Sequence, residues 1–403
     1  MKKRLIIFLL TFSSFLFAQK RDLRDIEIVE SIPAGTTLEN ADLRNASDVW
    51  IEMIDHADKT IDLEQFYISN EPGRLLEPVL AALYRAADRG VAIRVIVDAR
   101  MYSTYPQSVD SLEAYPNIET RKIDFGKIAG GIQHSKYFIV DSKEIFVGSQ
   151  NFDWRALEHI HELGLRISNT EIAASYESVF TYDWSAAAGT LPPIPVSPNP
   201  GYTTAVHDGA ETIAAISPTF SPKGFIPDSA LWDETAILRV INQSRKTLTL
   251  QFLGYSTAER RGGSYTVIDN AIRAAAQRGV DVKLIVADWE KGSTGVKGLQ
   301  ELSGLPNIHV AFSVIPEWNG GYIPFARVEH CKYIVADERT FWLGTSNCEK
   351  NYFYNTRNLG ITGESSPIGK RLNAIFTKSW NSPYMEMITP EGSYQRREHG
   401  EKK

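Results

Sequence analysis

Apolar residues recur in two matching series along this chain. The segment 60–67 (TIDLEQFY) parallels 247–253 (TLTLQFL), and 89–98 (RGVAIRVIVD) parallels 278–287 (RGVDVKLIVA). Short, nearly continuous apolar runs of this kind are typical of strands that are buried on both faces. The pattern therefore predicts that the chain consists of two similar halves.

Between the two strands of each half, apolar residues recur at three- and four-residue spacing, which forms one face of a helix. A strand, a helix and a second strand make a βαβ unit, with parallel strands and a right-handed crossover. We therefore expect a duplicated α/β fold. The helical positions are Leu75, Leu76, Val79, Leu80 and Leu83 in one half, and Val267, Ile268, Ala271, Ile272 and Ala275 in the other.

Proline content marks the boundary between the halves. The segment 191–201 (LPPIPVSPNPG) has five prolines among eleven residues, which predicts a stiff, extended connector. We assign 191–220 to this connector, 19–190 to the N-terminal half and 221–385 to the C-terminal half. The remaining residues, 386–403, are a charged C-terminal tail, and we expect its end after Tyr394 (QRREHGEKK) to fray.

The N-terminus has the composition of a secretory signal peptide. Lys2, Lys3 and Arg4 precede the apolar run 5–18, which is shorter than the roughly 20 residues that a membrane span needs. We expect residues 1–18 to be removed and the protein to be exported, either to the periplasm or to the medium.

Composition narrows the possible partners. The hydrophobic content of 43% and charged content of 23% are ordinary for a globular protein. The net charge of −6 excludes a protein that is basic over its whole surface, so nucleic acid would need a locally positive cleft. Two cysteines, Cys331 and Cys348, are too few for a disulfide framework, and either a single bridge or two buried thiols is compatible with the sequence.

One polar pattern occurs in both halves. Residues 134–151 (HSKYFIVDSKEIFVGSQN) and 330–347 (HCKYIVADERTFWLGTSN) share His-x-Lys, four residues, Asp, and then Gly and Asn at matching distances. Because alternate side chains share a face in a strand, each histidine points the same way as its lysine. Two imidazoles and two ammonium groups would form one site if the two halves face each other.

Each motif is predicted to be a hairpin. Asp141 and Asp337 lie between two apolar runs, at an odd spacing from the lysines, so they face away and stabilise the turn. The second run of each hairpin then returns four polar residues to the histidines. These residues are Ser149, Asn151, Thr345 and Asn347.

This set of side chains suits chemistry at phosphorus. A neutral imidazole can attack phosphorus and form a phosphohistidine, while a protonated one donates to the leaving oxygen and later activates water. Lys136 and Lys332 would neutralise the non-bridging oxygens, and the amides and hydroxyls would donate hydrogen bonds to them. The scheme requires no metal and no cofactor. The proposed donors are Asn151, Asn347, Ser149 and Thr345.

The doubled motif resembles the phospholipase D superfamily, whose signature is HxKxxxxD followed by GSxN once per half. The resemblance implies a duplicated α/β phospholipase D fold. In this fold, two βαβ-containing halves with mixed sheets pack about a pseudo-two-fold axis and share one active site. In this superfamily, a carboxylate at about the spacing of Glu162, which follows His134 by 28 positions, holds the Nδ1–H of the histidine; the matching position after His330 is Asn358. We infer that His134 is the nucleophile and His330 the general acid and base.

Further segments resemble the branch that contains the animal endolysosomal 5′-exonucleases, namely 216–222 (ISPTFSP), 323–328 (IPFARV) and 380–384 (WNSPY). This resemblance implies metal-independent hydrolysis of single-stranded DNA or RNA from the 5′ end, which releases nucleoside 3′-phosphates. The alternative is a phospholipase D or transphosphatidylase that acts on lipid head groups. The chain departs from the branch in having few cysteines, a cleavable signal and Asn355 near a glutamate position.

Aromatic residues near the second motif are candidates for stacking on bases. The same residues could instead simply fill the core. They are Trp318, Tyr322, Phe325, Tyr352, Phe353 and Tyr354.

Overall fold

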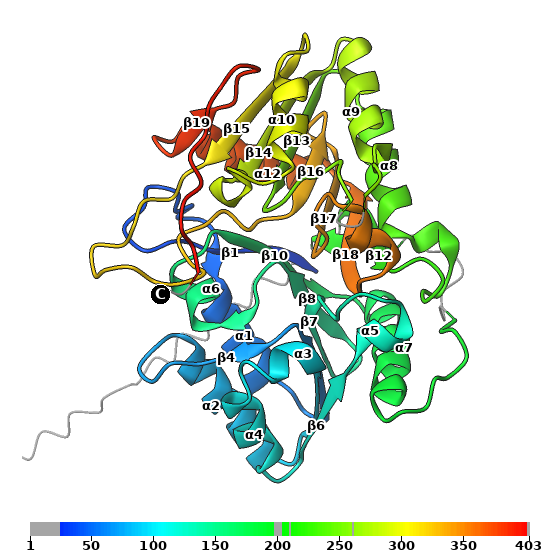
Figure 1. Ribbon diagram of the computed structural model, residues 1–403. Coiled ribbons are helices and arrows are strands. Elements are labelled where there is room, and N and C mark those ends of the chain that lie inside the picture. Colours follow the sequence, from blue (N-terminus) through cyan, green and yellow to red (C-terminus); the bar gives the residue numbers. More distant parts are fainter. Residues whose placement is uncertain (1–24, 197–203, 209–210, 260–261, 401–403) are drawn as a thin grey trace, which may run out of the picture.

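The computed structural model describes residues 25–196, 204–208, 211–259 and 262–400. The predicted signal peptide and the second part of the Pro-rich segment lie outside the described residues. The described chain forms two large mixed sheets, which lie side by side (Figure 1). The duplicated α/β fold is thereby confirmed.

The first sheet has eight strands. Its β3, β5 and β6 are parallel, and the strands from β3 through β7, β8 and β10 to β1 are antiparallel. In spatial order, the strands are β2 (Arg44–Asn45), β1 (Ile26–Ser31), β10 (Glu162–Ser168), β8 (Glu144–Gly148), β7 (Lys136–Val140), β3 (Thr60–Gln65), β5 (Ala92–Asp98) and β6 (Ile118–Ile123).

The second sheet has nine strands and repeats the same central order. Here β13, β14 and β15 are parallel, as β3, β5 and β6 are in the first sheet. In spatial order, the strands are β11 (Thr204–Asp208), β12 (Glu211–Ser221), β18 (Asn358–Glu364), β17 (Thr340–Gly344), β16 (Tyr333–Ala336), β13 (Thr247–Phe252), β14 (Asp281–Ala287), β15 (Ile308–Ser313) and β19 (Met385–Met387). A small separate sheet pairs β4 (Ile68–Ser69) with β9 (Phe152–Asp153).

Helices cover the sheets as the apolar spacing predicts. The predicted helical faces fall in α2 and α9, although Leu75 and Val267 lie at the helix starts and stay exposed. The first-half helices are α1 (Ala46–Asp55), α2 (Leu76–Asp88), α3 (Ala99–Tyr102), α4 (Gln107–Glu113), α5 (Phe125–Ile128), α6 (Trp154–Glu158) and α7 (Thr170–Ala187). The second-half helices are α8 (Asp233–Gln243), α9 (Val267–Gln277), α10 (Val296–Ser303), α11 (Lys350–Tyr354) and α12 (Ser366–Trp380), with 3-10 turns η1 (Ser229–Leu231) and η2 (Asp288–Glu290). Over the residues that the structure describes, no helix is both long and apolar enough to span a bilayer.

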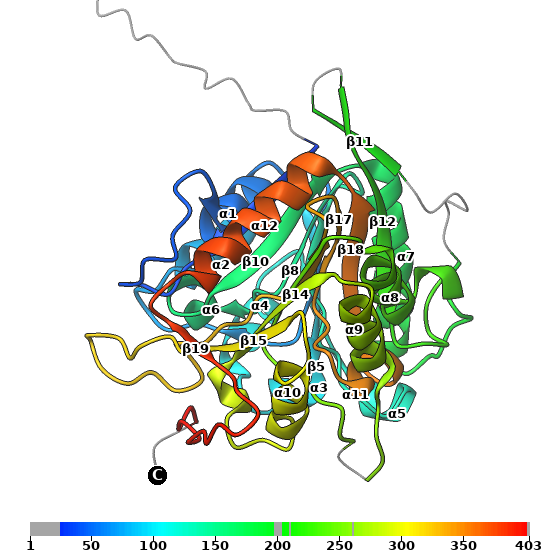
Figure 2. The same ribbon diagram turned by 90° about the horizontal axis from the view of Figure 1, so that it is seen from above.

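The two halves share one core. A single cluster of buried apolar side chains includes Val147 and Leu163 of the first sheet together with Leu343 and Leu359 of the second. Two helices reach across the boundary: Tyr176 on α7 donates to the carbonyl of Gly360, while α12 lies close to the N-terminal segment of the first half (Figure 2). The halves are therefore packed together as one unit.

Two boundaries differ from the sequence prediction. The connector assigned to 191–220 is shorter, because β11 and β12 belong to the second sheet and β12 pairs with β18. The charge-rich end after Tyr394 does not fray over its described part, because Arg397 pairs with Asp288 and the carbonyls of His399 and Gly400 accept hydrogen bonds. The segment before it is also packed, since Ile388 is buried and the Tyr394 ring packs on Phe312. These contacts join distant parts of the chain, so local composition did not indicate them.

The two motif hairpins form as predicted, and their aspartates explain the turns. Asp141 and Asp337 have φ values of 52° and 54°, in the left-handed region. The carboxylate of Asp141 accepts hydrogen bonds from three successive backbone N–H groups, at 2.7–2.9 Å, where β3 begins. Asp337 accepts three equivalent bonds where β13 begins. Each aspartate thus joins its hairpin to the neighbouring strand and has a structural role.

Candidate active site

Both motif histidines lie where one half meets the other. The backbone N–H of His134 donates to the carbonyl of Arg357 at 3.0 Å, and that of His330 donates to the carbonyl of His161 at 2.9 Å. The residues before the histidines form parallel bridges with the same two partners. The backbone at the start of each motif is therefore hydrogen-bonded to the opposite half.

The imidazoles also take their side-chain partners from the opposite half. His330 Nδ1 lies 2.7 Å from Glu162 Oε2, and His134 Nδ1 lies 3.1 Å from Asn358 Oδ1. This corrects the sequence prediction, which paired Glu162 with His134, and it removes the basis on which that prediction made His134 the nucleophile. The pairing crosses because β18 packs against β7 and β8 at the boundary, and local spacing along one half does not reveal which histidine is nearer.

The two motif lysines are buried, and each bonds the backbone of the histidine two residues before it. Lys136 Nζ donates to the carbonyl of His134 at 2.6 Å, and Lys332 Nζ donates to that of His330 at 2.7 Å. Burial lowers the pKa of Lys332 to about 8 and that of Lys136 well below its ordinary value. The ammonium groups lie close enough for the charge of Lys332 to lower the pKa of Lys136 further, and such a pair favours binding of an anion.

Burial and these cations set the protonation of the imidazoles. Burial, and then the charges of Lys136 and Lys332, lower the pKa values of both His134 and His330 well below 6.5. Burial also raises the pKa of Glu162 well above its ordinary value. A proton shared by His330 and Glu162 is therefore well placed for donation, while His134 has only an amide partner and stays neutral.

The Gly-Ser-x-Asn and Gly-Thr-Ser-Asn segments divide into two roles. Ser149 and Thr345 are fully buried, and their hydroxyls bond Leu163 O and Asn358 Oδ1, respectively. They therefore support β10 and the partner of His134, and their contact with phosphate stays a prediction. Asn151 has a buried Oδ1 without a hydrogen-bond partner among the described residues. This atom is an acceptor, so the role of the Asn151 amide as a phosphate donor stays a prediction.

Asn347 is almost fully buried, and its Oδ1 accepts only a long 3.4 Å bond from Gly254 N–H. Its prediction as a phosphate donor is compatible with this contact.

Cys331 and Cys348 are both free, buried thiols. Of the two possibilities that the sequence left open, the structure therefore has two thiols and not a disulfide bridge.

Two aromatic rings lie beside His134. The centroid of Phe66 is 5.0 Å from that of the imidazole, and the centroid of Tyr352 is 5.1 Å from it. Both aromatic residues are half-buried. Sequence reasoning missed Phe66, although it directly follows Gln65, which pairs with Lys136, so strand alignment could have indicated it.

The other aromatic candidates lie elsewhere. Phe353 is fully buried in the core, and Tyr354 packs against Trp232. Trp318 packs against His159, while Tyr322 and Phe325 bond the C-terminal tail through backbone atoms of Gly400 and His399. Among the six candidates, only Tyr352 contacts a motif histidine in the described structure.

Comparison with known proteins agrees with this architecture. A family model described as "Cardiolipin synthase, PLD-like domain" matches residues 50–184 and 237–380. Phospholipase D Z of Dictyostelium discoideum is 32% identical over 90% of this chain and 91% of its own length. The 5'-3' exonuclease PLD3 of Xenopus tropicalis is 29% identical over 92% of this chain and 82% of its own.

A solved structure supports the fold. Phosphatidylserine synthase of Haemophilus influenzae Rd KW20 superposes with a TM-score of 0.61 over 90% of this chain and 87% of its own, at 16% identity. The duplicated fold and the paired His-x-Lys motifs define a class of enzymes that cleave phosphodiesters. The chain belongs to the phospholipase D-like family.

Proposed function

We propose that this enzyme is a metal-independent 5′-exonuclease, which hydrolyses single-stranded DNA or RNA to nucleoside 3′-phosphates. The observation that carries the proposal is the placement of Phe66 and Tyr352 beside His134. Half-buried rings next to a phosphate site can stack on unpaired bases regardless of their sequence. Similarity to a relative named as a 5'-3' exonuclease over nearly the whole chain supports the same substrate class.

The proposed reaction begins with His134. Its neutral Nε2 attacks the phosphorus, forming an N–P bond as the P–O5′ bond breaks, and His330 gives its proton to the departing O5′. The shortened strand leaves with a 5′-hydroxyl. Water then attacks the phosphohistidine, giving a proton to His330 and releasing the nucleoside 3′-phosphate.

The role of each histidine rests on its partner. A general acid must hold a proton before reaction, and Glu162, whose pKa burial raises, can share a proton with His330 across their 2.7 Å contact. A nucleophile must be neutral, and the amide of Asn358 orients His134 without adding charge. The buried Lys136 and Lys332, with Asn151 and Asn347, would stabilise the charge that develops on the non-bridging oxygens.

The substrate class is tested with one purified preparation in the presence of chelator. A 5′-hydroxyl oligonucleotide carrying a 3′ fluorophore should shorten stepwise, mass spectrometry should identify nucleoside 3′-phosphates, and His134→Ala should abolish both. Head-group release from phosphatidylcholine without oligonucleotide degradation would instead support the lipid alternative, which similarity to a relative named phospholipase D favours.

The histidine roles are tested separately. Acid-free quenching and peptide mapping should find phosphate on His134, and the His330→Ala variant should accumulate this adduct with an activated aryl phosphodiester. Phosphate on His330 would reverse the two roles without altering the substrate class.

A further inference from the structure

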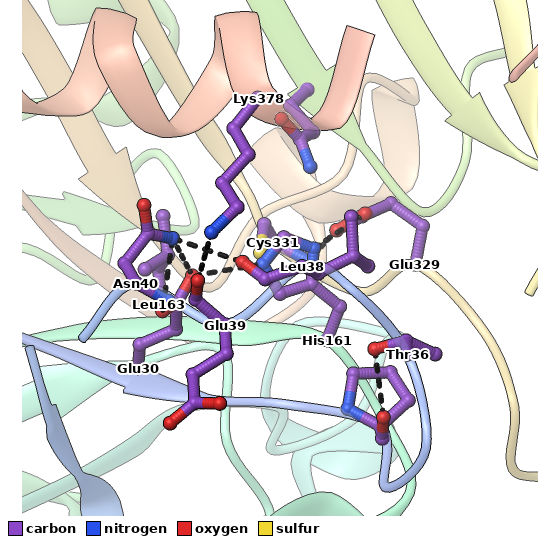
Figure 3. Close-up of polar contacts among 12 residues, drawn as sticks. Glu30, Thr36, Leu38, Glu39, Asn40, His161, Leu163, Glu329, Cys331 and Lys378 are labelled. Carbon is purple, nitrogen blue, oxygen red and sulfur yellow. Dashed lines mark hydrogen bonds and ion pairs between the residues drawn. The ribbon is translucent and has the colours of Figure 1, made fainter. Parts of the chain in front are cut away.

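A third histidine lies behind the active site and is fully buried. His161 precedes β10, and its ring lies between two carboxylates: Nδ1 is 2.7 Å from Glu329 Oε2, and Nε2 is 3.2 Å from Glu30 Oε1 (Figure 3). When both carboxylates are ionised, each ring nitrogen must carry a proton to satisfy both contacts, and the ring is then an imidazolium. Burial opposes this charge, yet Cys331 first, and then the charge of Glu329, raise the pKa of His161 well above its ordinary value.

Both carboxylates are held in place by other contacts. Glu30 on β1 accepts hydrogen bonds from the backbone and the side chain of Asn40, at 3.2 and 2.8 Å. Glu329 accepts a bond from the backbone N–H of Cys331 at 3.1 Å. The segment around Asn40 is in turn fixed by Lys378 of α12, which donates to the carbonyl of Glu39 (Figure 3). The imidazolium is therefore held between two anchored groups.

His161 and Glu329 are the immediate sequence neighbours of the catalytic pair. Glu162 follows His161, and His330 follows Glu329. Two adjacent residues of one half thus bind two adjacent residues of the other, through 2.7 Å contacts in both cases. The backbone is also joined, since His161 N–H donates to Val328 O and His330 N–H donates to His161 O. Movement of either pair would move the other.

The opposite half is built differently at the equivalent position. Arg357 lies where His161 would be, and its guanidinium pairs with Asp183 at 2.7 Å inside the protein. Asn358 then contacts His134, as Glu162 contacts His330. A buried basic residue thus precedes each partner: His161 precedes Glu162, and Arg357 precedes Asn358. His161 pairs with Glu329, the residue next to His330, whereas Arg357 pairs with Asp183.

We propose that His161 is a positioning residue, whose contacts with Glu30 and Glu329 fix the orientation of the Glu162–His330 pair. The donor atoms of His161, Glu329 and Cys331 also lie within 4.8 Å of one another, a combination that Zn²⁺ accepts. The 2.7 Å contact between Nδ1 and the carboxylate is a hydrogen bond, however, and ligands on one zinc ion would lie farther apart. The geometry therefore favours the imidazolium over a metal.

The test compares His161→Gln with His161→Arg, using a small phosphodiester with an unactivated alkyl leaving group, so that the rate depends on proton donation by His330 and not on the natural substrate. His161→Gln should lower kcat about 10- to 100-fold, as loss of an outer-shell partner does at metal sites, with KM within about twofold. If Glu162 is no longer oriented toward His330, the pair loses its proton more easily and the alkaline limb of the pH profile of kcat should move to lower pH, whereas loss of the charge of His161 alone would move it to higher pH. His161→Arg, which supplies the cation of the other half, should restore part of the rate.

Two further variants keep the proposal open to refutation. Glu30→Gln removes a partner of His161 and leaves both motifs unchanged, so it should shift the same limb in the same direction. This variant provides the test if His161→Gln does not fold. His309→Gln changes a half-exposed histidine and should have no effect. An unshifted pH profile in folded His161→Gln and Glu30→Gln would overturn the proposal. So would stoichiometric zinc in the purified enzyme that is lost in Cys331→Ser.

Discussion

At the scale of single residues, the partners of the two imidazoles distinguish two chemically similar histidines. One has a carboxylate and the other an amide, and each partner comes from the opposite half. Carboxylate and amide have nearly the same shape, so the difference between them is mainly one of charge and proton affinity. Exchanging one for the other therefore tests the assignment of roles without disturbing the packing.

The residue-scale prediction concerns Glu162→Gln. In the wild type, the pair of His330 and Glu162 can hold the proton that the leaving group needs. Without the carboxylate, burial and the charges of Lys332 and Lys136 keep the pKa of His330 low, so the proton is lost at lower pH. We expect kcat to fall about 10- to 100-fold and its alkaline limb to move to lower pH.

The wild-type profile follows from the same contacts. His134 must be neutral in the free enzyme, and burial keeps its pKa well below 6.5. The acid limb of kcat/KM should therefore lie below pH 6.5 and should not move in Glu162→Gln. An acid limb above pH 7, or one that moves with this substitution, would contradict the assignment of His134 as the nucleophile.

At the scale of elements, the hairpins could be predicted closely from the sequence. The apolar runs around Asp141 and Asp337 correspond to β7 and β8, and to β16 and β17. Alternation in a strand is a local property, so the sequence indicates which way each His-x-Lys pair points. The crossed partners depend on how two distant strands meet, and no local pattern encodes that contact.

The element-scale prediction concerns Asp141→Ala. This substitution removes the acceptor for three backbone N–H groups at the start of β3. These groups are partly solvated, so the free energy of unfolding should fall by about 1–3 kcal/mol. Denaturant unfolding measures this loss, with the exposed Glu391→Ala as the control. Since the carboxylate lies away from the histidines, kcat should stay within about twofold, and a large loss of kcat in the folded variant would give Asp141 a role in catalysis.

At the scale of the whole molecule, duplication was predictable but its consequences for packing were not. Repeated strands and helices appear in the sequence as repeated apolar spacing. The addition of β12 to the second sheet was missed because Pro218 argues against a strand, although β12 pairs on both sides. The folded tail was missed because its contacts are to residues about 80 to 110 positions earlier, such as Phe312 and Asp288.

The whole-molecule prediction concerns the separated halves. Residues 19–190 and 191–403, produced apart, would each expose the apolar surface that they now share, and each would lack the partner of its histidine. We expect neither to hydrolyse a phosphodiester, and circular dichroism with denaturant should show no cooperative unfolding. Co-expression should recover some activity. Full activity from either half alone would show that the shared site is unnecessary.

Each repeat supplies the partner for the histidine of the other, Glu162 from β10 and Asn358 from β18, so the two repeats also constrain each other's evolution. A substitution at Glu162 is felt first by the histidine of the other repeat, and the same holds for Asn358. A change in one repeat therefore alters the proton affinity of the histidine in the other repeat. Replacing one repeat by a copy of the other would do the same. Selection acts on the two copies as a single inherited unit.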